Sequence, residues 1–162
     1  RHEFGDRYTF AELCKEAEET DYITSRIDVN NKCFLAPENM TEAIKSYCNN
    51  NDLIIPDTAG EIAAVVYKSL ADSYADTVMQ IEKNLDITYD AIYVIGGGAN
   101  AGYLNQLTAD STGKTVVAGP AEATAIGNIM AQMIADSVFK NLKEARACVR
   151  DSFDIKRFEQ KR

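Results

Sequence analysis

The chain has 162 residues, of which 46% are hydrophobic, and a formal net charge of −8 at neutral pH. This length and apolar content are sufficient for a domain with a real core and argue against disorder. The acidic balance excludes a nucleic-acid binder that neutralises phosphates with Lys and Arg, and no apolar run approaches the ~20 residues of a membrane helix. We therefore expect a globular cytoplasmic protein with no nucleic-acid or membrane partner.

Cysteine and histidine are too scattered for a metal site. The four cysteines, Cys14, Cys33, Cys48 and Cys148, form no CxxC pair, and the single histidine is His2. Structural zinc needs ligands paired at close spacing. We therefore expect no metal site and free, mostly buried thiols, as suits a reducing compartment. The sequence has no initiator Met, so we also expect it to be a piece of a longer protein.

The first part of the chain is predicted to be helical. A solvated acidic helix is expected from Thr9 to Glu19, with Thr9 as its N-cap. A second helix is expected to begin at Pro37, which suits a first helical turn, and to end at the triple Asn49-Asn50-Asn51.

The clearest helix opens with a capping-box pattern. Thr58 is followed three residues later by Glu61, a spacing at which each side chain caps a backbone N–H of the other residue. Apolar residues then recur at helical spacing as far as Leu85. A short polar link leads from this helix to a predicted strand, Ile92 to Ile95, which is rich in β-branched residues.

From the capping box onward, the predicted order is helix, strand, glycine loop, helix, strand and helix. The helix after the glycines stops at Gly113, Lys114 to Ala118 form a short strand, and Thr124 starts the next helix. This alternation predicts an α/β fold in which helices pack on a small parallel pair of strands. The inner face of the helix after the glycines is expected at Tyr103, Leu104, Leu107 and Ala109. Beyond these elements we expect one more helix, with Leu142, Ala145 and Val149 on one face, and a solvated tail, KRFEQKR.

The strongest sign of a binding site is the run of Gly96, Gly97 and Gly98 directly after the predicted strand. A loop without side chains lets a ligand lie against the backbone, and the following helix N-terminus offers N–H groups and a positive dipole end. One interpretation is the dinucleotide fingerprint, G-x-G-x-x-G/A, completed by Ala101, although the second strand ends in no acidic residue that could hold a ribose. Another is a structural turn, for which three glycines are excessive because each costs about 0.5–1 kcal/mol in chain entropy.

A third interpretation comes from a resemblance. The stretches VIGGGANAGYLNQLTAD and TGKTVVAGPAEATAIGNIMAQMIA resemble the C-terminal lobe of the FGGY carbohydrate kinases. The stretches FLAPENMTEAIKSYC and IPDTAGEIAAVVYKSLADSYADTV resemble segments that precede them in the same family. GGGA alone occurs across actin-like ATPases, whereas AGPAEATAIGN is similar to one branch of the family and unlike the xylulose and glycerol kinases. The likeness covers about Ile27 to Ala135.

This resemblance implies the C-terminal portion of an actin-like, ribonuclease-H-like ATPase lobe. Residues 37–136 would be the partial nucleotide-binding lobe, 1–36 an irregular and helical lead-in, and 137–162 a C-terminal helix and tail. The whole enzyme would bind ATP and a ketose sugar, and a missing N-terminal lobe would complete it.

The resemblance also implies which residues bind the nucleotide. The adenosine-binding loop would consist of five consecutive residues: Gly96, Gly97, Gly98, Ala99 and Asn100. The glycines would line the adenine and ribose, and the last two residues would lie at the turn. Several relatives carry Asn at the position of Ala101, and Asn100 could replace that contact.

The catalytic base of such an enzyme belongs to a His-Asp-Thr-Ala-Ser motif. Asp57, Thr58 and Ala59 match its centre, but Pro56 stands in place of the histidine and Gly60 in place of the serine. The capping box explains these residues without chemistry. We therefore expect no catalytic or metal-binding residue in this chain, and a base and Mg²⁺ ligands that lie outside it. A non-catalytic actin-like nucleotide-binding module is the alternative.

Overall fold

The computed structural model describes residues 7–20 and 22–161, and His2 lies outside the described residues. The chain folds as two units, one ending at Ile87 and one beginning at Thr88. We call them the N-terminal unit and the C-terminal unit and describe each by itself. The predicted domain boundaries at residues 37 and 136 stay a prediction.

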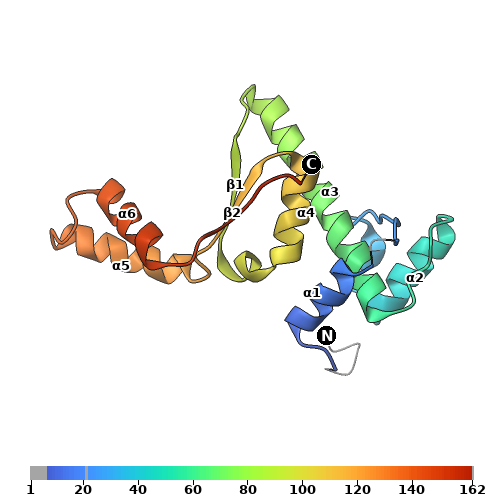
Figure 1. The fold of residues 1–162 in the computed structure, drawn as a ribbon. Coiled ribbons are helices and arrows are strands. Elements are labelled where there is room, and N and C mark those ends of the chain that lie inside the picture. Colours follow the sequence, from blue (N-terminus) through green and yellow to red (C-terminus); the bar gives the residue numbers. More distant parts are fainter. Residues whose placement is uncertain (1–6, 21, 162) are drawn as a thin grey trace. The chain divides into compact units, whose positions relative to one another are not determined.

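The N-terminal unit is helical. Its elements are α1 (Phe10–Glu18), the 3₁₀ helix η2 (Lys32–Phe34), α2 (Met40–Asn50) and α3 (Ala59–Leu85), shown in blue to green in Figure 1. The predicted N-caps Thr9 and Thr58 are confirmed, because each accepts a hydrogen bond from the backbone N–H three residues later in a complete capping box. The start of the second helix was predicted too early: α2 is capped by Asn39, not begun by Pro37.

Helix α1 packs closely against α3. A Cβ atom added at Gly60 of α3 would lie 2.9 Å from the Cβ of Glu16 and 3.2 Å from its backbone carbonyl. Ala17 of α1 is fully buried. Helix α1 is therefore a surface helix, as predicted, with one side covered by α3.

The core of this unit lies between α2, α3 and the extended segment that precedes η2. Its buried apolar residues are Ile23, Ile27, Ile44, Cys48, Ile62 and Val65. Ser69 of α3 holds the extended segment in place, because its hydroxyl accepts a 3.0 Å hydrogen bond from the N–H of Ile27 and donates a 2.6 Å bond to the carbonyl of Val65. Both bonds satisfy groups that burial would otherwise leave without water.

The C-terminal unit combines helices with a small sheet. Its elements are β1 (Ala91–Val94), the 3₁₀ helix η3 (Gly96–Asn100), α4 (Gly102–Thr112), β2 (Thr115–Ala118), α5 (Ala123–Ala135), α6 (Leu142–Ser152) and β3 (Lys156–Phe158). Strands β1 and β2 are parallel, as predicted, with Val94 opposite Ala118. Helix α4 packs against β2, and α5 packs against α6 (Figure 1).

The sheet has a third strand that the sequence did not reveal. Strand β3 pairs antiparallel with β2, with Phe158 opposite Val116, so the sheet is mixed. The prediction of a solvated tail was therefore wrong for these residues. Beyond β3 the chain remains tied to α4, because the side chain of Asp110 accepts a 2.7 Å hydrogen bond from the N–H of Lys161, and Gln106 donates a 2.8 Å bond to the carbonyl of Glu159.

The cysteines are free, but fewer are buried than predicted. Cys48 is buried and Cys14 is half-buried, whereas Cys33 and Cys148 are exposed. Among the described residues, the helices are all too short or too polar to cross a bilayer.

Candidate functional site

The glycine run lies at the carboxyl end of β1. Ile95 is still extended, and the five residues Gly96–Asn100 then form the 3₁₀ helix η3 rather than a simple turn into α4. Gly97, Gly98 and Asn100 are exposed, Gly96 is half-buried, and Ala99 is buried. The five predicted loop residues therefore form one continuous turn of helix, and three of them, Gly97, Gly98 and Asn100, are exposed to solvent.

The fold itself needs glycine at only some of these positions. Gly96 has a φ of +74°, a left-handed conformation that other residues rarely adopt. At Gly97, in contrast, φ is not positive and an added Cβ would meet no atom within 4 Å. Neither backbone conformation nor packing within the described residues explains why position 97 lacks a side chain.

A second loop lies beside the glycine run. The carboxyl ends of parallel strands share one sheet edge, and the N–H of Gly119, just after β2, donates a 2.9 Å hydrogen bond to the carbonyl of Val94. The carbonyl of Ala121 lies 4.0 Å from where a Cβ of Gly96 would stand. The AGPAEATAIGN stretch is thus in contact with the glycine loop, at the edge where α/β sheets bind ligands.

Two helices begin at this edge without a side-chain cap. The N-cap residues are Ala101 for α4 and Glu122 for α5, and neither forms a side-chain hydrogen bond to its helix. Helix α6, in the same unit, is capped by Asn141. The N-termini of α4 and α5 are therefore not covered by a capping side chain, and their dipoles favour an electron-rich partner.

Sequence reasoning missed one residue of this site, Asn105. Its side chain is only 3% exposed, and its amide nitrogen donates hydrogen bonds of 3.2 Å to the carbonyl of Gly98 and 3.3 Å to that of Ala99. The predicted inner face of α4 was partly wrong, because Leu104 and Leu107 are only half-buried. The signal that could have located Asn105 is its spacing of four residues from Ala101, which puts both on one helical face.

The stretch that matches the centre of a catalytic motif is a helix start, as predicted. The carboxylate of Glu61 accepts hydrogen bonds from the N–H groups of Asp57 and Thr58, at 2.6 Å and 2.9 Å. The side chain of Asp57 is 91% exposed and forms a 3.3 Å ion pair with Lys45. These contacts account for the stretch as a cap, with nothing that orients Asp57 as a base.

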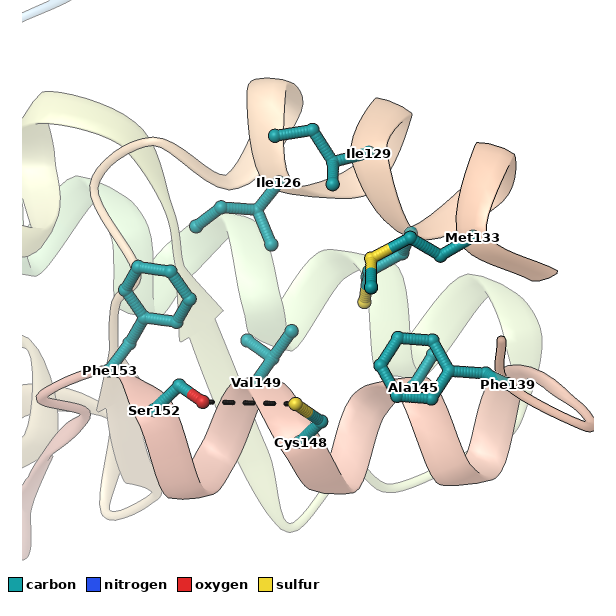
Figure 2. Close-up of a pocket in the computed structure, with 10 residues that line it drawn as sticks. Ile126, Ile129, Met133, Phe139, Ala145, Cys148, Val149, Ser152 and Phe153 are labelled. Atoms are coloured by element: carbon teal, nitrogen blue, oxygen red, sulfur yellow. Dashed lines mark hydrogen bonds between the residues drawn. The ribbon is translucent and has the colours of Figure 1, made fainter. Parts of the chain in front are cut away.

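The described residues offer no metal cluster, and they form an apolar hollow. Within residues 7–20 and 22–161, no three His, Cys, Asp or Glu side chains are grouped so that they could hold a metal ion. A pocket of about 150 Å³ lies between α5 and α6, lined by Ile126, Met133, Val149 and Phe153 among others (Figure 2). Its lining is apolar, which suits neither a phosphate nor a sugar.

Comparison with known proteins places this geometry in a family. Residues 5–135 match the FGGY family of carbohydrate kinases, C-terminal domain. The chain is 47% identical over 154 residues to a rhamnulokinase of Bacillus subtilis, an alignment that covers 95% of this chain and 32% of the relative. It is 44% identical over 155 residues to a rhamnulokinase of Oceanobacillus iheyensis, covering 96% of this chain and 33% of the relative.

A rhamnulokinase of Lactiplantibacillus plantarum is 39% identical over 158 residues, which cover 98% of this chain and 32% of the relative. The chain thus spans about a third of the length of these curated relatives. It belongs to the FGGY family of carbohydrate kinases and corresponds to the C-terminal domain of an α/β kinase. The predicted resemblance to the FGGY carbohydrate kinases is thereby confirmed.

Proposed function

From this family membership, we propose that the chain is the C-terminal, nucleotide-binding part of an ATP-dependent rhamnulokinase. The intact enzyme would transfer the γ-phosphate of ATP to the 1-hydroxyl of L-rhamnulose in rhamnose catabolism. The substrate assignment is supported by the relatives, which are named rhamnulokinase and match nearly the whole of this chain. The proposed fold is one actin-like lobe, which the rest of the enzyme would complete.

The proposed adenosine site is the surface of η3. Gly97 and Gly98 offer exposed backbone on which a flat purine could lie, Asn100 is exposed as well, and Gly96 and Ala99 are more buried. The observation that carries this assignment is Gly97, whose missing side chain the fold does not explain. A nucleoside lying over this position would explain it, because a Cβ there would take up the space of the base or ribose.

The chemical step would depend on groups outside this chain. Phosphoryl transfer needs a carboxylate that accepts the proton of the sugar hydroxyl, and Mg²⁺ that neutralises the phosphates. The described residues hold no cluster of three metal-ligating side chains, and the Asp57 stretch is a helix cap. We therefore assign this chain the binding and orientation of the nucleoside.

The test is Gly97→Val in the full-length enzyme. A branched side chain on the exposed loop should raise KM for ATP at least tenfold, the loss that about 1.4 kcal/mol of binding energy gives, and leave KM for L-rhamnulose unchanged. Thermal unfolding should change little, because a Cβ at this position meets no atom of the fold within 4 Å. Equal effects on both KM values would contradict an adenosine role.

A second measurement uses the 162-residue chain alone, assayed for phosphorylation of L-rhamnulose with ATP and Mg²⁺. We expect no turnover, because the base is assigned to another part of the enzyme. Turnover by the isolated chain would overturn that assignment and leave the adenosine site to be judged by the Gly97 variant.

A further inference from the structure

We propose that Asn105 is a positioning residue that holds the glycine loop in its nucleotide-binding conformation. This inference rests on the proposed adenosine role of η3 and adds a residue that does not itself touch the nucleotide. Asn105 is polar, yet it is only 3% exposed to solvent. Its side chain forms hydrogen bonds to the glycine loop, which lies outside its own helix.

The geometry follows from the direction of helical side chains. A side chain on an α-helix leans toward the N-terminus of that helix, so a residue in the first turn of α4 points back at the segment before it. Asn105 stands one turn beyond Ala101, whose carbonyl accepts the Asn105 backbone N–H at 2.9 Å. The neighbouring side chain, Gln106, bonds instead to Asp110 and to the carbonyl of Glu159.

The bonds formed by Asn105 satisfy the end of a short helix. The last carbonyls of a 3₁₀ helix have no partner within it. The carbonyl of Gly98 receives the N–H of Ala101 at 3.0 Å and the Asn105 amide, and the carbonyl of Ala99 also receives that amide. An amide nitrogen carries two N–H donors, so one side chain can serve both carbonyls.

The hydrogen bonds from Asn105 matter for binding because the glycine loop has much conformational freedom of its own. Two of its five residues, Gly97 and Gly98, are exposed glycines, which lose much conformational freedom when they are ordered. A loop that is already ordered binds its ligand more tightly, because binding then costs less conformational entropy. Asn105 supplies that order from a rigid helix.

The experiment compares two equally buried side chains of α4 in the full-length enzyme. Asn105→Ala removes the bonds to the loop. Thr108→Ala is the matched control, because Thr108 is also 3% exposed and its hydroxyl bonds at 2.8 Å to the carbonyl of Leu104, within the helix. Both variants should lower the melting temperature. Only Asn105→Ala should raise KM for ATP about tenfold, with KM for L-rhamnulose unchanged.

Each outcome decides a different question. Similar KM values for ATP in the Asn105 and Thr108 variants would overturn the positioning role and leave only a structural one. A Gly97→Val enzyme with unchanged KM for ATP would instead remove the proposed adenosine site. If Asn105→Ala does not fold, Asn105→Ser is measured in its place, because a serine hydroxyl is too short to reach the loop carbonyls yet can bond to its own helix. It should raise KM for ATP in the same way.

Discussion

In the two units, the requirements of folding explain different shares of the residues at helix starts and at glycine positions. In the N-terminal unit, the helices α1, α2 and α3 each begin with a side-chain cap, and Gly60 is required by the contact of α1 with α3. In the C-terminal unit, the helices that follow β1 and β2 begin without such a cap, and a Cβ added at Gly97 would meet no atom within 4 Å.

The contrast is not a general property of the C-terminal unit. Helix α6 of the same unit is capped by Asn141, and Gly113 ends α4 in a left-handed conformation, as a glycine at a helix C-terminus commonly does. Gly97 and the two helix starts without a side-chain cap lie at the carboxyl ends of the parallel strands, although a Cβ added at Gly127, inside α5, would also meet nothing. Since exposed groups with no structural role are candidates for binding, the comparison of the two units supports the proposed site by an argument that does not use the family match.

The strongest test of the comparison makes the same substitution in both units. Gly60→Ala should destabilise the N-terminal unit by about 2 kcal/mol, because the new methyl group overlaps the backbone of α1 and helices must separate to admit it. Gly97→Ala should leave the C-terminal unit unchanged or stabilise it by about 0.5 kcal/mol, because alanine only restricts the unfolded chain.

Hydrogen exchange, measured peptide by peptide in urea, reports the two units separately. We expect faster exchange in α1 and the first turns of α3 for Gly60→Ala, and no change around η3 for Gly97→Ala. A large loss of protection around η3 in the second variant would show that Gly97 has a structural role, and the contrast between the units would fail there.

The elements that sequence predicted well are those specified by local signals. Helix α3 has a capping box at one end and a left-handed Asp86 at the other, with a helical apolar period between them. The position of the glycine loop followed from a β-rich run directly before Gly96. In both cases the residues that specify the structure are neighbours in the chain, so no tertiary information was needed.

The failures arose where distant or polar contacts decide the structure. Strand β3 is three residues long and two of them are charged, so it carries no alternating pattern, and it forms because β2 offers an edge. The buried face of α4 includes Asn105 and Thr108, which hydrogen bonds rather than hydrophobicity place inside. The role of Asn105 depends on loop carbonyls that only the fold brings to it.

Removing a cap should have a smaller effect that again separates the two kinds of helix start. Thr58→Ala should destabilise the N-terminal unit by about 1 kcal/mol, because its hydroxyl accepts the Glu61 N–H at 3.2 Å. Glu122→Ala, at an N-cap without a side-chain bond, should change stability by less than about 0.5 kcal/mol. Urea unfolding of both variants checks this difference, and equal losses would mean that Glu122 stabilises α5 in some other way.

The smallest expected effect is a pH dependence confined to the N-terminal unit. The Tyr22 hydroxyl donates a 2.6 Å hydrogen bond to Glu61, whose carboxylate also accepts from the backbone of Thr58 and Asp57. These bonds hold the pKa of Glu61 below its ordinary value of 4.5, and the bond to Glu61 raises the pKa of Tyr22 above its ordinary 10.0.

The direction of each shift fixes the pH window of the effect. A lowered carboxyl pKa gives stability that is present above pH 4.5 and is lost as the pH falls through the folded-state pKa. A raised tyrosine pKa gives stability that is present below pH 10.0 and is lost as the pH rises through the folded-state pKa. Urea unfolding from pH 3 to 11 should therefore show a plateau between these limits. Glu61→Gln should reduce the loss of stability on the acid side, where the lowered pKa of Glu12 also contributes. Tyr22→Phe should reduce the loss of stability on both sides, because the Tyr22 bond is the largest cause of the lowered Glu61 pKa and the Tyr22 hydroxyl is itself the group whose pKa is raised. A variant that changes only one side would contradict the shared hydrogen bond.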